Sequence, residues 1–218
     1  MPSRIDTFFS DADREAIHAA TVDAERNTAG EIVVYVVERC DPHGEAAWKG
    51  AVLGGALGAA LAALGTHLFG GWGTSDDLWL LIGLQAGLLA GWLASRFEEV
   101  ARRLIGAEAL SSRARGRAAE AFVEESVFAT AGRTGVLIFV ALFEHRVLVL
   151  PDDGIRKLVG ADAWDGIATS IAAGIRAGTP APALAAAIGR CAELLEAHGV
   201  PGDGAENELS NQPRFRDA

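Results

Sequence analysis

The sequence of 218 residues is poor in cysteine, in basic residues and in large aromatic side chains. Its two cysteines, Cys40 and Cys191, lack CxxC spacing, so we expect neither a zinc site nor a disulfide scaffold. Lysine and arginine number 19 against 29 acidic residues, which gives a net charge of -10. This balance excludes a nucleic-acid-binding protein, because such a protein needs a basic face. The first residues contain no long apolar run, and we therefore expect no signal peptide.

The sequence is instead rich in small apolar residues, which are concentrated in two runs. Residues 51–69 and 78–94 carry no formally charged side chain, and the eight residues GGWGTSDD separate them. At 1.5 Å per residue, each run is long enough to cross a hydrocarbon core of ~30 Å. Because the connection is short, the pattern predicts an antiparallel transmembrane hairpin over residues 49–95.

Glycines recur at four-residue spacing in both runs. They are Gly50, Gly54 and Gly58 in the first run and Gly83, Gly87 and Gly91 in the second. In lipid, close backbone approach through such residues drives helix association, so the glycine faces can pair within the hairpin or join two copies in a homo-oligomer. The alternative is a soluble protein with buried Ala/Gly-rich helices. We favour the membrane, because an interior glycine costs a helix in water about 1 kcal/mol.

The charges that flank the two runs predict their orientation. The basic residues are Lys49 before the first run and Arg96, Arg102 and Arg103 after the second. The connection carries Asp76 and Asp77 and no basic residue. By the positive-inside rule, both termini lie in the cytoplasm and the chain is a multi-pass protein of the inner cell membrane.

Four further residues lie near the predicted ends of the spans. Trp72, Trp79 and Trp92 are expected in the headgroup region, which suits their amphipathic rings. His67 lies near the far end of the first span, so we expect it at the interface rather than as a functional group inside the membrane.

The remaining sequence predicts a small α/β domain that the hairpin interrupts. Its first part, residues 10–39, contains a helix that starts after Ser10 and the buried strand 31–38. Its second part, residues 96–198, contains a helical stretch interrupted near Ser111 and Ser112, a strand pair ending at Pro151, and two helices. Residues 199–218 are polar and are expected to be disordered. The prediction is therefore a three-stranded domain.

Three local patterns resemble the TPM domain family. They are TAGEIVVYV at 28–36, RTGVLIFV at 133–140 and EHRVLVLPDDGI at 144–155. Together with the element order, they resemble in particular the bacterial subgroup that carries a transmembrane hairpin inside the domain. The resemblance implies an α/β/α sandwich around a short sheet. It also implies acid phosphatase activity, divalent-metal binding, or a role in the assembly or repair of membrane complexes, which are linked to different members.

The strand-exit turn contains the candidate metal ligands. Asp152 and Asp153 are adjacent carboxylates followed by Gly154, and hard cations such as calcium or magnesium need several oxygen ligands. Glu124 and Glu125 would complete such a site if the end of their helix approached this turn. The competing interpretation, which we favour, is that Asp-Asp-Gly only shapes the turn.

Two candidates for catalytic chemistry are weaker. His145 has a side chain suited to general base catalysis or phosphoryl transfer, but no Walker, Cys-x5-Arg or DxDx motif accompanies it. Cys40 and His43 stand three residues apart without evident oxyanion donors, which disfavours a nucleophile and base. We therefore expect an accessory or assembly factor for other membrane proteins. The alternative is a metal-assisted phosphatase that uses Asp152, Asp153 and His145.

Overall fold

The computed structural model describes residues 4–26, 28–69, 76–130, 132–200 and 208–217, and these form two compact units. One unit comprises Met1–Asp41 with Ser112–Ala218, and the other comprises Pro42–Ser111. The chain thus leaves the first unit after its first strand and returns to it later. The second part of the domain begins at Ser112 rather than at residue 96.

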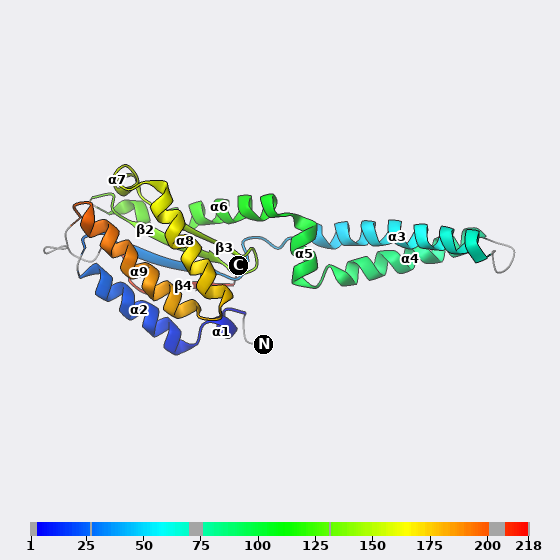
Figure 1. Ribbon diagram of the computed structural model, residues 1–218, viewed down its shortest axis with the longest axis horizontal. Coiled ribbons are helices and arrows are strands. Elements are labelled where there is room, and N and C mark those ends of the chain that lie inside the picture. Colours follow the sequence, from blue (N-terminus) through cyan, green and yellow to red (C-terminus); the bar gives the residue numbers. More distant parts are fainter. Residues whose placement is uncertain (1–3, 27, 70–75, 131, 201–207, 218) are drawn as a thin grey trace. The chain divides into compact units, whose positions relative to one another are not determined.

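A four-stranded mixed sheet of order β3-β2-β1-β4 forms the centre of the first unit (Figure 1). The strands are β1 (Ile32–Val37), β2 (Val136–Ala141), β3 (Arg146–Pro151) and β4 (Arg214–Arg216). β2 pairs in parallel with β1 and antiparallel with β3, and β4 adds a short parallel pairing to the other edge of β1. Every residue of β1 and β2 is buried, which explains why both strands read as continuous apolar runs.

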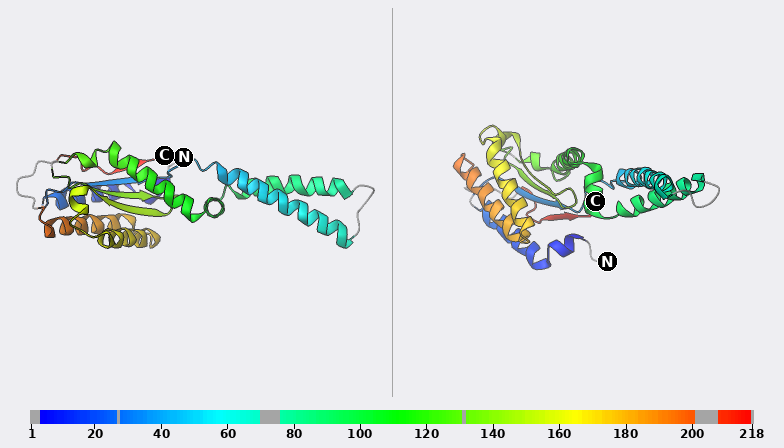
Figure 2. Two further views of the ribbon diagram at one scale, coloured as in Figure 1. Left: turned by 90° about the horizontal axis from the view of Figure 1, so that it is seen from above. Right: turned by 45° about the vertical axis from the view of Figure 1, so that its right-hand side comes forward.

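Helices cover both faces of this sheet, so the predicted α/β/α layering is confirmed (Figure 2). One face packs against α2 (Asp11–Glu25), α8 (Ala161–Arg176) and α9 (Pro180–Ala197). The opposite face packs against α6 (Ala107–Glu124) through buried alanines. These are Ala114, Ala118 and Ala121, which lie against the face that carries Tyr35 and Phe139. Small side chains let the α6 backbone approach these two stacked rings.

The ends of the helices follow local signals in part. Ser10 closes a capping box with Asp13 and starts α2 as predicted, because its side-chain oxygen accepts from the Asp13 N–H at 3.2 Å. The helical stretch after the hairpin does not break at Ser111 and Ser112, which lie inside α6. It breaks at Gly106, whose φ of 93° separates α5 (Glu98–Ile105) from α6. Glycine adopts this angle without steric cost, whereas serine disfavours it.

The C-terminal segment differs from the prediction of a disordered tail. Residues 201–207 and 218 lie outside the described residues, but 208–217 pack on the sheet and include β4. The Phe215 ring lies 5.3 Å from that of Phe9, and Arg214 Nε lies 2.6 Å from Glu125 Oε2. These side-chain contacts explain why so polar a segment is ordered. Two short helices, α1 (Arg4–Phe8) and α7 (Asp153–Arg156), and the 3-10 turn η1 (Val127–Ala129) complete the unit.

The second unit contains the helical hairpin of α3 (Glu45–Phe69) and α4 (Asp76–Ala94). Both helices are long and apolar enough to cross a membrane. The two glycine series face one another: a Cβ added to Gly83 would lie 2.6 Å from the Gly58 carbonyl oxygen, and one added to Gly50 would lie 2.6 Å from that of Gly91. The glycine faces therefore meet within one chain. Trp72 and most of the predicted connection lie outside the described residues.

Candidate functional site

The turn after β3 is organised by an ion pair between Arg133 and Asp152. Arg133 donates from Nε to Asp152 Oδ2 at 2.7 Å and from Nη2 to Oδ1 at 2.9 Å. Asp152 is only 3% exposed, and its Oδ1 also accepts the Asp153 N–H at 2.7 Å at the start of α7. Both carboxylate oxygens thus have a partner inside the protein. This arrangement agrees with the interpretation of Asp-Asp-Gly as turn chemistry.

The other three candidate metal ligands also contact arginines. Asp153 pairs with Arg156 at the exposed side of α7. Glu124 Oε2 accepts from both terminal nitrogens of Arg117 at 3.1 Å, and Glu125 pairs with Arg214 as described above. Among the described residues, none of the four carboxylates belongs to a group of three ligand residues whose atoms lie within 4.8 Å. A shared calcium or magnesium site stays a prediction, and it would have to replace these arginine contacts.

His145 lies at the end of the β2–β3 hairpin. Its φ is 52°, and its backbone N–H points to the Leu142 carbonyl at 3.4 Å. The side chain is exposed and lines a cavity of about 270 Å³ with residues from α8. The structure therefore separates His145 from the Asp152 turn, because the two occupy opposite ends of β3. A catalytic site that joins them is not supported by this placement.

Cys40 is poorly suited to be a nucleophile. Burial raises the pKa of its thiol, and the nearby Glu144 carboxylate raises this pKa further. The Glu144 side chain also accepts the Cys40 N–H at 2.9 Å. Because the thiolate is the reactive form, a thiol with a raised pKa is inert at neutral pH.

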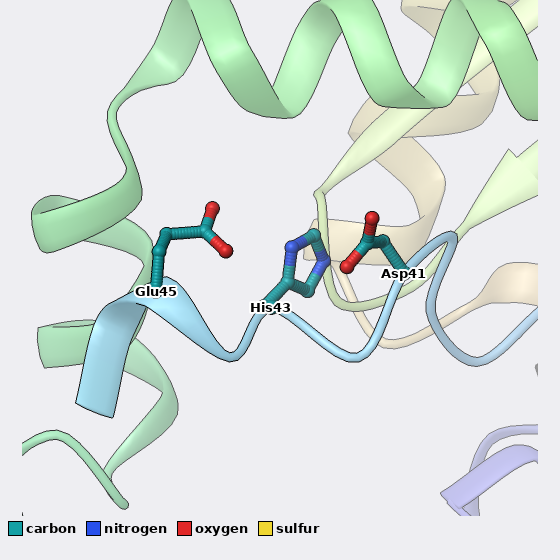
Figure 3. Close-up of side chains that lie close together, drawn as sticks. All are labelled: Asp41, His43 and Glu45. Carbon is teal, nitrogen blue, oxygen red and sulfur yellow. The ribbon is translucent and has the colours of Figure 1, made fainter. Parts of the chain in front are cut away.

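Residues 41–45 contain a potential cation-ligating group that our sequence analysis missed. Asp41, His43 and Glu45 each offer one ligand atom, and these atoms lie within 4.8 Å of one another (Figure 3). The His43 ring lies between the two carboxylates, and Asp41 also lies 3.8 Å from Arg113 Nε. The signal was the alternation of Asp, His and Glu. Three ligands are fewer than the six to eight that calcium takes, so water would have to supply the others.

A pair of carboxyls next to β1, the partly buried Glu25 and the buried Glu31, was also missed. Glu25 Oε1 accepts the Ile32 N–H at 2.9 Å, and Glu31 Oε1 accepts the Glu208 N–H at 2.8 Å. Burial raises the pKa of Glu25 to about 7, and the proximity of Glu31 raises it as well. The pKa of Glu31 is also raised, again mainly by burial. No local motif marks Glu25 or Glu31. Their pKa values are raised because the C-terminal segment, which is distant in the sequence, packs over them.

Comparisons with known proteins support the fold. No family model matches the sequence, and no curated protein sequence matches it. Among solved structures, the chain is similar to the NMR structure of the BA42 protein from the psychrophilic bacterium Bizionia argentinensis. The TM-score is 0.58 at 19% identity, over 97% of this chain and 98% of that one. At this identity the similarity concerns the fold alone. The fold of this chain is mixed α/β, and two of its helices are long and apolar.

Proposed function

We propose that the chain is an integral membrane protein that α3 and α4 anchor in the inner cell membrane. Its TPM-like α/β domain would then serve as an accessory or assembly factor for other membrane proteins. The observation that carries this proposal is the exposure of the hairpin. In the most apolar 18-residue stretch of α3, only 6% of the residues are buried. In the corresponding stretch of α4, 0% of the residues are buried.

The exposed side chains of the hairpin are large and apolar. Leu53, Leu57, Leu61 and Leu68 of α3 are all more than half exposed, as are Leu81 and Leu89 of α4. In water these leucines would form an apolar surface far larger than soluble monomers tolerate. In a bilayer they face acyl chains, while the glycines on the inner side bring the helices together. The arrangement thus favours lipid over water as the surrounding medium.

The proposed orientation places the α/β domain in the cytoplasm. Lys49 lies in the second turn of α3, and Arg96, Arg102 and Arg103 follow α4, whereas Asp77 lies at the start of α4. The Arg96 guanidinium lies 4.4 Å from the centre of the Trp92 ring, a pair suited to the headgroup region. The positive-inside rule then assigns both termini to the cytoplasmic side.

The accessory role rests on the resemblance to the TPM family and on exposed apolar side chains of the domain. Val123 at the end of α6 is 62% exposed, and Phe128 in η1 is 39% exposed. Such residues next to charged ones are typical of a protein contact surface. We infer that these residues contact the other membrane proteins on which the chain acts.

Membrane fractionation tests the first part of the proposal. We expect the full chain to resist washing with high salt and with alkaline carbonate, and to be extracted by detergent. Release by either wash would contradict membrane insertion.

A photo-crosslinker at Val123 tests the accessory role: we expect discrete adducts with membrane proteins that Phe128→Asp abolishes. The matched control is Leu158→Asp, which changes an equally apolar exposed residue on another part of the domain.

A further inference from the structure

The first unit contains an apolar cavity at the end of the β2–β3 hairpin. Its volume is about 270 Å³, and its walls come from α1, from β2 and β3, and from the last turns of α8. Phe8, Val140, Val147 and Ile175 supply apolar walls. Val140 belongs to the buried core of this face, and Phe8, Val147 and Ile175 are partly buried side chains that pack against that core, so the cavity borders the hydrophobic core.

The charged side chains around this cavity are basic or imidazole groups. His145, Arg146 and Arg176 line it, and none of its lining residues among those described is acidic. This distribution differs from that of the whole chain, in which acidic residues outnumber basic ones by 29 to 19. An apolar cavity with cationic side chains suits a ligand that has an apolar body and an anionic end.

The end of α8 does not counteract this preference. A helix C-terminus repels anions when its last carbonyls are unsatisfied. Here the carbonyls of Ala173, Gly174 and Ile175 accept the backbone N–H groups of Ala177, Thr179 and Gly178 respectively. Because these acceptors are satisfied and Arg176 lies in the same last turn, the end of α8 does not exclude a carboxylate from the cavity.

We propose that this cavity binds a single-chain fatty acid, with the alkyl chain among the apolar walls and the carboxylate at Arg146 and Arg176. A methylene group occupies about the volume of a water molecule, roughly 30 Å³. The cavity therefore accommodates about eight or nine such groups, which indicates a chain of medium length. A two-chain phospholipid does not fit this volume. The proposal concerns the α/β domain and does not depend on insertion of the hairpin in a membrane.

A titration with fatty acids of increasing length tests this proposal. The full chain is placed in nanodiscs of phosphatidylcholine at pH 7.5, and binding is followed by the ¹³C-methyl NMR signals of Ala172 and Ile175. We expect octanoate to bind about fifteenfold more tightly than hexanoate, because each buried methylene strengthens binding about fourfold. The gain in affinity with each added methylene should largely cease once the fatty acid is longer than about ten carbons. Nanodiscs that contain phosphatidylglycerol should not shift the signals, which distinguishes a free fatty acid from a membrane lipid.

Two pairs of variants locate the binding site. Ala172→Leu fills the cavity and should weaken octanoate binding at least tenfold, whereas Ala173→Leu changes an exposed neighbour on the same helix and should not. Arg176→Gln should weaken binding about three- to fivefold, as expected for a solvent-accessible ion pair. Lys157→Gln removes an exposed charge away from the cavity and should have no effect.

Three results would overturn the proposal. The first is equal binding of octanoate to the wild type and to a folded Ala172→Leu variant. The second is equal binding of octanoate, 1-octanol and octyltrimethylammonium, because the cationic residues would then confer no selectivity. The third is a set of methyl shifts that depends on phosphatidylglycerol and not on octanoate, which would assign the cavity to the membrane lipid.

Discussion

Arg133 and Asp152, nineteen residues apart in the sequence, form a two-point ion pair in which the carboxylate is almost fully buried. Asp152 closes the end of β3 and caps α7, while the Gly154 N–H donates to the Arg133 carbonyl at 3.1 Å. The pair therefore connects the start of β2 to the exit of β3. It gives the Asp-Asp-Gly turn a structural role that depends on Asp152 more than on Asp153.

Replacing Asp152 should destabilise the α/β domain. We expect Asp152→Asn to lower the free energy of opening β2 and β3 by about 1 to 3 kcal/mol, because it removes charge-assisted hydrogen bonds from a buried site. Asp153→Asn should cost less than about 0.5 kcal/mol, since this side chain is 51% exposed. Amide hydrogen exchange of the two strands measures both values. Stabilisation of the wild type by calcium that Asp153→Asn abolishes would instead support the cation site.

The sequence was informative where structure depends on neighbours in the chain. The capping box at Ser10, the apolar strands β1 and β2 and the glycine spacing of the hairpin are all local patterns. The sequence was less informative where contacts between residues far apart in the chain determine the structure. Arg214 contacts Glu125 across 89 residues, and no local signal relates the two. The three-residue strand β4 is likewise ordered by tertiary contacts, so its polar sequence reads as a tail.

Packing of α3 against α4 should depend on the paired glycines. We expect Gly54→Val combined with Gly87→Val to separate the helices by about 1 to 2 Å, because added side chains must move from overlap to van der Waals distance. Spin labels at the exposed residues Leu61 and Leu81 report this distance. Gly65→Val is the matched control, since a Cβ at Gly65 meets nothing within 4 Å. An unchanged distance in the double variant would contradict the glycine contact.

The C-terminal strand should protect the edge of β1. Phe215→Ala removes the contact with the Phe9 ring and with Arg14, whose guanidinium lies 4.6 Å from the Phe215 ring centre. We expect the Glu38 amide, which donates to the Arg216 carbonyl, to exchange faster by the equivalent of about 1 to 2 kcal/mol. Leu158→Ala, an exposed apolar control, should leave this amide unchanged. Equal exchange in both variants would show that the strand is held by other contacts.

The raised pKa of Glu25 should make domain stability depend on pH. The folded state binds a proton at Glu25 more tightly than the unfolded state, whose pKa is close to 4.5. The free energy of unfolding therefore decreases as pH rises from about 4.5 to 7. We expect the wild type to lose about 1 to 2 kcal/mol more than Glu25→Gln over this range, allowing for the partial exposure of the side chain. Exchange of β1 amides, corrected for intrinsic pH effects, measures the difference. Parallel profiles would argue against a shifted Glu25.

The proposal that α3 and α4 cross the membrane with both termini in the cytoplasm is tested most directly by cysteine labelling in intact cells. Asp77→Cys and Glu193→Cys are introduced separately into a chain whose Cys40 and Cys191 are replaced by alanine. We predict that a membrane-impermeant maleimide labels position 77 in intact spheroplasts and labels position 193 only after the membrane is opened. Labelling of both positions, or of position 193 alone, in intact spheroplasts would contradict the proposed topology.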